Sequence, residues 1–317
     1  MTELLAIKSD FERFDEWTDA FTECDKTGNP NQKLDIVDWN EIHDKAAVDY
    51  ALVWKPEPES LLQFPNLKVI FSVGAGLDHL KGEKILPPGV PVVRMVEKGL
   101  TAGMVEYVVY HVLRHHRDMA HYEQQQSENR WHGILQKPAE HRNIGILGLG
   151  ELGKACADAL NYLGFNVAGW SRTEKFHPAV QCYFGDNQLD DMLSSSEVLV
   201  CLLPLTGETR GILNAQLLAK LPEGACLINA GRGHLQVEKD ILNALDSGHL
   251  GSAALDVFEI EPLPANSRLW NHPNVSITPH VASMTLPATS SVHVYENIIR
   301  FRNNQPMTHV ADMERGY

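Results

Sequence analysis

The sequence predicts an α/β protein made of two doubly wound parallel-sheet domains, Rossmann-like or flavodoxin-like, with a cleft between them. Three observations predict this fold class. Short apolar segments of strand length alternate with helical patterns along most of the 317 residues. The chain is long enough for two domains. A predicted strand at residues 144–147 runs directly into a glycine-rich turn and then a helix, which is typical of a nucleotide-binding unit.

The glycine-rich turn has the G-x-G-x-x-G spacing of a dinucleotide site. Gly148 permits a tight turn, Gly150 lets a pyrophosphate approach the main chain, and Gly153 lets the helix pack closely on the strand. The helix, expected over about 151–163, offers free N–H groups and a positive dipole end to phosphates. An ordinary glycine-rich turn is the alternative. The expected dinucleotide contacts here are Gly148, Gly150, Glu151, Leu152 and Gly153.

Composition argues against several classes of partner. The formal net charge of −14 makes nucleic acid and anionic membranes unexpected partners. No apolar run approaches the ~20 residues of a membrane span, and the N-terminus lacks the pattern of a signal peptide. The five cysteines show no C-x-x-C and no histidine pairing at metal spacing. We expect a cytoplasmic, reduced protein without a metal, in which Cys156, Cys201 and Cys226 are small buried hydrophobes.

The first part of the chain predicts a parallel sheet. The expected strands are 4–7, 34–37, 50–54, 67–73 and 92–95, and the expected helices are 11–21 and a short turn after Asp78. The loop Gly74-Ala75-Gly76-Leu77-Asp78 ends the fourth strand. Its main-chain N–H groups could hold a small carboxylate, with a plain turn as the alternative.

Residues 101–121 predict a long amphipathic helix, and the polar segment 122–142, with Trp131 and Pro138, predicts an extended linker or arm. A domain boundary is therefore expected near this helix, with residues 1–104 and 286–317 forming a substrate-binding domain and 105–285 a nucleotide-binding domain. No carboxylate or cysteine set accompanies the basic end of the helix, so we interpret it as a solvated face rather than a metal site. That end carries Arg114, His115, His116, Arg117 and His121.

The second part of the chain predicts six strands with crossover helices. The strands are expected at 144–147, 167–170, 198–203, 226–229, 251–257 and 275–278, with helices such as 214–220 and 237–246 between them. A final helix, about 288–303, has no strand pattern near it. We expect it to return and pack on the first domain.

The residues after the second of these strands indicate the cofactor. An acid at this place would accept hydrogen bonds from the ribose 2′-hydroxyl of NAD, but the sequence is Trp170-Ser171-Arg172-Thr173. A guanidinium can bind a 2′-phosphate in a fork. NADP(H) is therefore favoured, with Arg172 as a merely solvated side chain being the alternative.

Three polar residues follow three neighbouring strand ends. Arg232 lies between glycines, and its planar fork suits a substrate carboxylate. The segment from Asp256 to Glu261 follows the next strand, and His280 follows the last. A histidine held by a carboxylate is suited to donate a proton. Each residue alone could be structural, but their joint placement on consecutive strand ends favours a catalytic site.

Together with further motifs, these residues make the chain resemble the D-isomer-specific 2-hydroxyacid dehydrogenases over essentially its full length, most closely the glyoxylate/hydroxypyruvate reductase A branch. The motifs are Ala51-Leu52-Val53-Trp54, Gly74 to Asp78, Gly148 to Gly153, Trp170-Ser171-Arg172, Leu255 to Phe258 with Glu261-Pro262-Leu263-Pro264, Leu269-Trp270, His272-Pro273, Thr278-Pro279-His280 and Arg315-Gly316-Tyr317.

The resemblance implies that Arg232, Glu261 and His280 are the catalytic set and that Asp256 contacts the nicotinamide end. It also implies a homodimer in which Trp131 can reach the partner's active site. One departure is Gly231, where this branch often has a bulkier residue. The expected cofactor contacts further along the chain are Ser171, Arg172, Thr173, Leu203, Pro204, Thr209, Ala230, Gly231, Arg232, Asp256 and His280. The expected substrate contacts are Trp54, Ala75, Gly76, Leu77, Arg232 and His280.

The sequence thus predicts NADPH-dependent reduction of glyoxylate and hydroxypyruvate by hydride transfer, with His280 as proton donor. Trp54, Leu77 and Met95 are expected to limit substrate size, and the cleft is expected to close over the substrate. Larger 2-oxo acids such as phenylglyoxylate are an alternative. An NAD-linked dehydrogenase of D-lactate or phosphoglycerate type is another, which Arg172 and the lack of a regulatory domain after the last helix disfavour. An NAD(P)H-sensing co-regulator is the non-enzymatic alternative.

Overall fold

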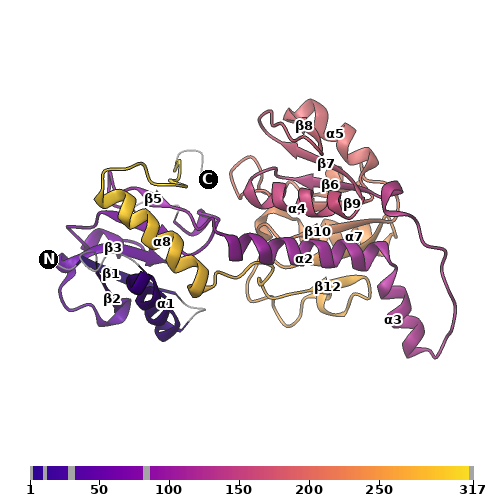
Figure 1. The fold of residues 1–317 in the computed structure, drawn as a ribbon. Helices are drawn as coiled ribbons and strands as arrows, with labels where there is room; N and C mark the ends of the chain where they lie inside the picture. Colours follow the sequence, from indigo (N-terminus) through magenta and orange to yellow (C-terminus); the bar gives the residue numbers. More distant parts are fainter. Residues whose placement is uncertain (1–2, 10–12, 28–32, 81–85, 314–317) are drawn as a thin grey trace. The chain divides into compact units, whose positions relative to one another are not determined.

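The computed structural model describes residues 3–9, 13–27, 33–80 and 86–313. Contacts within the chain divide it into two compact units, Met1–Leu100 with Met284–Tyr317 (unit 1) and Thr101–Ser283 (unit 2). Each unit is built on its own parallel sheet flanked by helices (Figure 1). The predicted α/β class with two parallel sheets is therefore confirmed. The predicted C-terminal motif, residues 315–317, lies outside the described residues.

Unit 1 contains a five-stranded parallel sheet in the order β2-β1-β3-β4-β5. All five strands lie where the sequence predicts them. The central strands are almost entirely buried, which explains their nearly continuous apolar sequences. The strands are β1 (Glu3–Lys8), β2 (Leu34–Asp38), β3 (Val48–Val53), β4 (Val69–Ser72) and β5 (Val92–Val93).

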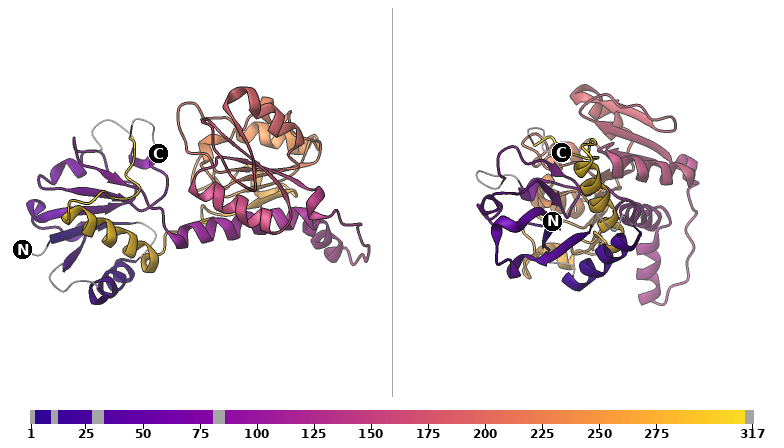
Figure 2. Two further views of the ribbon diagram at one scale, coloured as in Figure 1. Left: turned by 45° about the horizontal axis from the view of Figure 1, so that its top comes forward. Right: turned by 60° about the vertical axis from the view of Figure 1, so that its left-hand side comes forward.

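Two helices cover one face of this sheet. Helix α1 (Phe14–Thr27) and the final helix α8 (Pro287–Arg302) lie side by side there (Figure 2). Trp17 of α1 and Ile298 of α8 are fully buried in the same apolar core. The prediction that the last helix returns to the first domain is thus confirmed, because burying its apolar face requires that sheet.

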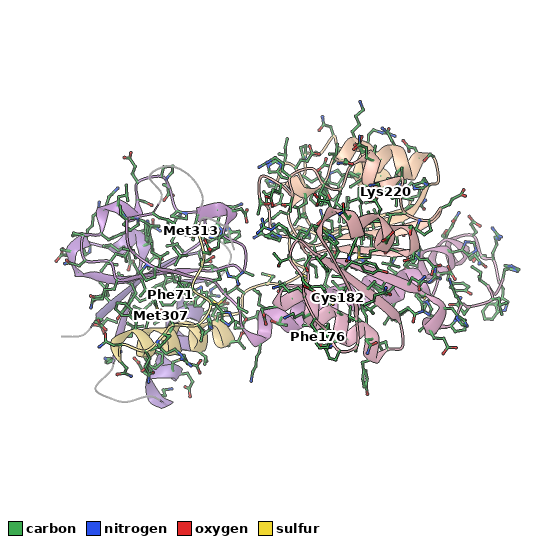
Figure 3. The ribbon with its side chains drawn as sticks, turned by 90° about the horizontal axis from the view of Figure 1, so that it is seen from above. Phe71, Phe176, Cys182, Lys220, Met307 and Met313 are labelled. Atoms are coloured by element: carbon green, nitrogen blue, oxygen red, sulfur yellow. The ribbon has the colours of Figure 1, made fainter. Side chains whose placement is uncertain are left out.

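The two faces of the sheet have separate apolar cores, which can be followed from labelled side chains (Figure 3). Phe71 and Met307 belong to the core under α1 and α8. Met313 packs against the other core, which contains Leu77. Residues following α8 therefore reach both cores of unit 1.

Unit 2 contains a seven-stranded parallel sheet in the order β12-β11-β10-β9-β6-β7-β8. Six strands lie where they are predicted. Strand β8 is not predicted, because it is a four-residue edge strand without a buried position, and so short an apolar segment does not distinguish a strand from a loop. The chain order reverses between β6 and β9, and ligands of such sheets bind at this point, beyond the carboxyl ends of the strands. The strands are β6 (Asn143–Leu147), β7 (Asn166–Ser171), β8 (Gln181–Phe184), β9 (Val198–Cys201), β10 (Ala225–Asn229), β11 (Leu250–Leu255) and β12 (Val275–Ile277).

The long helix differs from the prediction. Helix α2 runs over Lys98–His116, and the chain then turns at Asp118, whose φ of +53° is left-handed. Helix α3 (Met119–Ser127) follows, so the prediction of an extended arm is wrong for its first residues. The remaining helices of the unit are α4 (Glu151–Tyr162), α5 (Gly185–Ser195), α6 (Ala215–Leu218) and α7 (Glu238–Asp246).

The predicted solvated face is only partly confirmed: Arg117 and His121 are exposed, His115 is partly buried, and His116 is buried. His111 and His116 are buried, and His115 Nδ1 lies 3.3 Å from Ser252 Oγ. Burial lowers the pKa of His111 and that of His115 to about 4. The helix packs this end into the unit because Met104, Val108 and Val112 on the same helix join the core around β6.

Cys156, Cys201 and Cys226 are buried free thiols, as predicted. Burial raises the pKa of each, which keeps them protonated and unreactive. Within the described ranges, no helix combines the length and the apolar character that crossing a membrane requires.

Candidate active site

The three glycines of the turn after β6 meet different surroundings. Gly148 has a φ of +105°, and a Cβ there would lie 2.9 Å from the carbonyl oxygen of Leu202. A Cβ on Gly153 would lie 1.8 Å from the carbonyl oxygen of Gly148, so the helix can approach the strand only without a side chain. A Cβ on Gly150 would meet nothing within 4 Å. Two glycines are therefore required by packing, and the third leaves open space in front of α4.

This open space fits a dinucleotide pyrophosphate. Helix α4 begins at Glu151, and the first N–H of its ladder to bond within the helix is that of Lys154, which donates to the carbonyl of Gly150. The preceding N–H groups, including those of Glu151, Leu152 and Gly153, are the unpaired donors that a helix N-terminus offers to phosphates.

The end of β7 places Ser171 and Arg172 differently. Ser171 is buried, and its hydroxyl donates to the carbonyl of Thr173 at 2.8 Å. Arg172 is half-exposed, and its Nη1 lies 2.7 Å from Oε2 of Glu208. The guanidinium is thus at the surface, directed toward the loop that follows β9.

That loop contains three expected cofactor contacts and is held by its own hydrogen bonds. The Thr209 hydroxyl donates to the carbonyl of Pro204 at 2.7 Å and accepts from the N–H of Thr206 at 2.8 Å. Leu203 is part of the apolar core. The loop is therefore a fixed support for Glu208 rather than a free segment.

The turn after β10 carries Arg232. Buried Asn229 accepts from the N–H of Gly231 at 3.1 Å, and its Nδ2 donates to the carbonyl of Arg232 at 3.3 Å. Arg232 Nη1 donates to the carbonyl of Gly231 at 2.9 Å. A Cβ on Gly231 would come within 2.7 Å of Leu235 Cδ1, so a larger residue at this position would require the Leu235 side chain to move.

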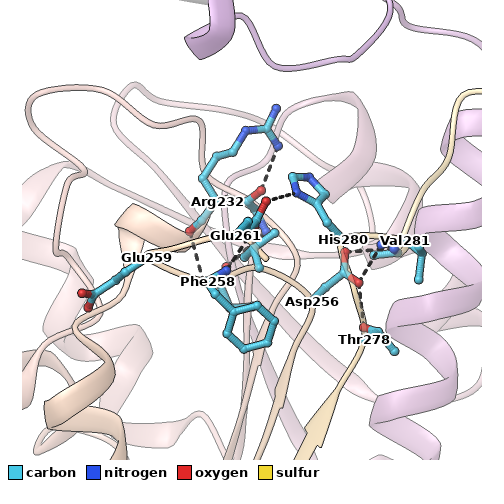
Figure 4. Close-up of polar contacts among 12 residues, drawn as sticks. Arg232, Asp256, Phe258, Glu259, Glu261, Thr278, His280 and Val281 are labelled. Atoms are coloured by element: carbon cyan, nitrogen blue, oxygen red, sulfur yellow. Dashed lines mark hydrogen bonds and ion pairs between the residues drawn. The ribbon is translucent and has the colours of Figure 1, made fainter. Parts of the chain in front are cut away.

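Glu261 and His280 form a pair at the ends of the next two strands (Figure 4). Oε2 of Glu261 lies 2.9 Å from Nδ1 of His280, and Oε1 accepts from the N–H of Phe258 at 3.1 Å. The two side chains are 28% and 30% exposed, so solvent or a ligand can reach them. The pair fixes the imidazole by one nitrogen and leaves Nε2 for proton exchange.

His280 stands in a turn that Asp256 holds. Its φ is +58°, and its N–H donates to the carbonyl of Asp256 at 2.8 Å. The Asp256 carboxylate accepts from the hydroxyl of Thr278 at 2.6 Å and from the N–H groups of Val281 and Ala282 at 2.9 Å each (Figure 4). Asp256 is 1% exposed, and these hydrogen bonds make its carboxylate the support of the His280 turn; its contact with the nicotinamide end stays a prediction.

The expected substrate contacts of unit 1 lie near one another around the end of β4. A Cβ on Gly74 would lie 2.7 Å from Cζ3 of Trp54, so the loop runs directly over the indole. Ala75 and Gly76 are partly exposed. Leu77 and Met95 are each 1% exposed, and their side chains belong to the cores instead of forming a pocket wall. A residue that the sequence did not single out, His79, packs against Trp54 with 4.3 Å between ring centroids and the ring planes tilted by 41°.

The structure brings Arg232, Glu261 and His280 to one edge of unit 2 because β10, β11 and β12 are adjacent and parallel. Asn229, Gln236 and Thr278 also support this edge and were not predicted. For Asn229, the last residue of buried β10, and Thr278, the residue after β12, the available signal was a polar residue at a strand end, where side chains often bond to neighbouring main chain. Gln236 lies in a loop beyond the turn and has no such signal.

Comparison with known proteins gives consistent matches. Residues 109–282 match the family model described as the D-isomer specific 2-hydroxyacid dehydrogenase, NAD binding domain. The chain is similar to a D-isomer specific 2-hydroxyacid dehydrogenase from Xanthobacter autotrophicus Py2 in complex with NADPH and MES, at 40% identity, 100% coverage of both chains and a TM-score of 0.93. It is also similar to an NADPH-dependent glyoxylate/hydroxypyruvate reductase from Sinorhizobium meliloti in complex with NADP and sulfate, at 40% identity, 100% coverage of both chains and a TM-score of 0.91.

Proposed function

Because the chain belongs to the D-isomer-specific 2-hydroxyacid dehydrogenase family, an oxidoreductase family, we propose that it reduces small 2-oxo acids with NADPH, with glyoxylate and hydroxypyruvate as leading substrates. The observation that carries the proposal is the 2.9 Å contact between Glu261 Oε2 and His280 Nδ1, on the sheet edge that also carries Arg232. An acid–histidine pair beside an arginine suits a substrate with a carboxylate next to a carbonyl.

Each of the three side chains has a distinct role in this proposal. Arg232 binds the substrate carboxylate through its planar guanidinium. His280 gives the proton on Nε2 to the carbonyl oxygen, and Glu261 holds the ring so that this nitrogen faces the substrate. When bound, the nicotinamide supplies the hydride. General acid catalysis by a positioned side chain contributes roughly 10²–10⁴ in rate.

The preference for NADPH rests on the end of β7 and on the similar proteins. No acid stands at the end of this strand, where Ser171 is followed by Arg172, and the nearest acid after it is Glu174. Arg172 offers a guanidinium where a 2′-phosphate would lie. The two similar structures contain NADPH and NADP. We assign cofactor binding to unit 2 and substrate binding to unit 1 as well as to Arg232 and His280. The unit 1 contribution would come from Trp54 and from the main chain of Ala75, Gly76 and Leu77.

The proposal includes a cytoplasmic homodimer. All five cysteines are free, which fits a reducing compartment. Trp131 and Leu135, in the segment after α3, are almost completely exposed, although large apolar side chains of this kind are usually covered. A partner subunit would cover them.

The test is the loss of NADPH absorbance on adding glyoxylate, followed by a panel of 2-oxo acids with NADPH and NADH. The expected result is turnover of glyoxylate and hydroxypyruvate at higher kcat/KM with NADPH. Turnover only of phenylglyoxylate-like acids would contradict the substrate assignment, and a preference for NADH would contradict the cofactor assignment. No turnover with any 2-oxo acid would favour an NAD(P)H-sensing role.

A further inference from the structure

Two segments that carry the proposed site, the turn after β10 and the segment after β11, are connected by two buried amide side chains. Asn229 and Gln236 are 0% and 2% exposed. Asn229 Nδ2 donates to Gln236 Oε1 at 2.8 Å, and Gln236 Nε2 donates to the carbonyl of Val257 at 3.0 Å. The connection therefore runs through side chains that no solvent reaches.

Each end of this connection lies next to a residue of the proposed site. At one end, Asn229 holds the N–H of Gly231 and the carbonyl of Arg232, which sets the conformation of the Arg232 turn. At the other end, Val257 precedes Phe258, whose N–H donates to Glu261. Since Glu261 in turn holds His280, hydrogen bonds and the Val257–Phe258 peptide link together connect the Arg232 main chain to the imidazole.

The two segments also touch directly. A Cβ on Gly233 would lie 1.7 Å from the carbonyl oxygen of Phe258, so the main chains are in contact at a place that admits no side chain. The N–H of Glu238 donates to Glu259 Oε1 at 2.8 Å, and the N–H of Glu259 donates to Glu238 Oε1 at 2.9 Å. These reciprocal bonds tie the start of α7 to the segment that carries Glu261.

We propose that Gln236 is a positioning residue: together with Asn229 it fixes the Arg232 turn relative to Glu261 and His280, and so sets the spacing between carboxylate binding and proton transfer. This inference rests on the proposed function. Amide side chains suit this positioning role because, in a buried pair such as Asn229 and Gln236, one arrangement satisfies the hydrogen-bond donors and acceptors of both. Losing one leaves the Val257 carbonyl without its amide donor, so the segment is free to shift. A shift of about 1 Å at a reacting geometry can cost about 10²-fold in rate.

The test compares the wild-type protein with Gln236→Met, which keeps the side-chain volume and removes the hydrogen bonds of Gln236 to Asn229 and Val257, together with its side-chain hydrogen bond to Glu238. We expect kcat/KM for glyoxylate to fall about tenfold or more, while KM for NADPH changes less than about twofold. KM for NADPH should stay near the wild-type value because the substitution does not alter the glycine turn after β6. Unchanged kcat/KM for glyoxylate, or an equal rise in KM for NADPH, would overturn the proposal.

Ser196→Ala is the matched control. Ser196 is also buried in unit 2, and its hydroxyl donates to the carbonyl of Met192 at 2.7 Å, away from the proposed site. We expect this variant to melt at a lower temperature with unchanged kinetic constants. A similar kinetic loss in Ser196→Ala would mean that any buried polar deletion has this effect, which would overturn the positioning role.

A double-mutant cycle with Glu261→Gln separates positioning from general destabilisation. If Gln236 acts through Glu261, Gln236→Met should lower kcat/KM for glyoxylate by a smaller factor in the Glu261→Gln variant than in the wild-type protein. A fall in kcat/KM by the same factor in the wild-type protein and in the Glu261→Gln variant would contradict the inference. Should Gln236→Met be insoluble, Gln236→Asn keeps both polar groups on a side chain one methylene shorter and makes the same comparison. Inactivity of the wild-type protein with every 2-oxo acid would overturn the proposed function together with this inference, whereas wild-type activity with unaffected variants would overturn the inference alone.

Discussion

Arg172 and Glu208 form an ion pair, with 2.7 Å between Nη1 and Oε2, although 36 positions separate them in sequence. Their side chains are 48% and 69% exposed, so the pair contributes little to stability, about 1 kcal/mol at most. A 2′-phosphate would need the same guanidinium and would carry more negative charge than the carboxylate. Glu208, which lies outside the end of β7, therefore competes with a 2′-phosphate for Arg172 and should affect the preference between NADPH and NADH.

The first prediction concerns Glu208. Glu208→Gln should lower KM for NADPH by roughly two- to fivefold, because the competing carboxylate is removed, and should leave KM for NADH nearly unchanged. Steady-state kinetics with both cofactors measure this. Glu223→Gln, which removes an exposed charge elsewhere on unit 2, is the control. Equal changes for NADPH and NADH would show that Glu208 does not compete for the phosphate.

Arg172 itself should determine the preference between the cofactors. Arg172→Ala should raise KM for NADPH about tenfold or more, since a charge-assisted hydrogen bond contributes about 1.5–3 kcal/mol. KM for NADH should change by less than about threefold. Steady-state kinetics with both cofactors test this. Similar changes in KM for NADPH and NADH would show that Arg172 does not bind the 2′-phosphate.

His280 should be needed for reduction but not for cofactor binding. His280→Ala should lower kcat by about 10²–10⁴, while NADPH binding, followed by fluorescence titration, stays within about twofold. His280→Asn is the matched variant, because asparagine tolerates the left-handed conformation seen at φ +58° and so preserves the turn. Near-normal turnover in either variant would rule out His280 as the proton donor.

Gly150 and Gly153 should respond to alanine in opposite ways. Gly153→Ala should lower the free energy of unfolding by about 3 kcal/mol or more, because its Cβ would lie 1.8 Å from the Gly148 carbonyl oxygen. Gly150→Ala should cost less than about 1 kcal/mol, since its Cβ meets nothing within 4 Å, yet should raise KM for NADPH by obstructing the pyrophosphate. Urea denaturation without cofactor and steady-state kinetics test the two claims. Tight NADPH binding by Gly150→Ala would argue against a pyrophosphate at this place.

The buried histidines of α2 should make stability depend on pH. Burial lowers the pKa of His111 and that of His115 to about 4, whereas the unfolded value is near 6.5. The unfolded chain therefore takes up protons first as the pH falls, so their stabilising contribution is complete above about pH 6.5 and is lost toward pH 4. Between pH 7 and pH 5, the melting temperature of His111→Phe should fall by less than that of the wild-type protein. The exposed His121→Gln should behave as the wild type, and an unchanged slope in His111→Phe would contradict the assignment.

Where the sequence-based prediction succeeded, the signal was local. Strands buried on both faces appear as apolar runs, and the requirement for glycine at Gly148 and Gly153 arises within one strand–turn–helix unit. Arg232, Glu261 and His280 could be placed on one edge because parallel strands bring their carboxyl ends together. Edge strand β8 escaped prediction because none of its residues is buried.

Where the prediction failed, the burial of the side chain depended on residues that are distant in sequence. His116 belongs to a helix end with the composition of a solvated face, but packing buries it. Leu77 and Met95 are core residues.

The sequence by itself determined the fold class, the glycine turn and the residue types at the strand ends, because these follow from periodicity and from the backbone needs of single residues. Only the tertiary structure decided what those residues contact. The pairing of Arg172 with Glu208, the use of Asp256 to hold the His280 turn, and the Asn229–Gln236 connection to Val257 each join separate segments. Their hydrogen bonds form only once packing has brought the strand ends together, so no local pattern could specify them.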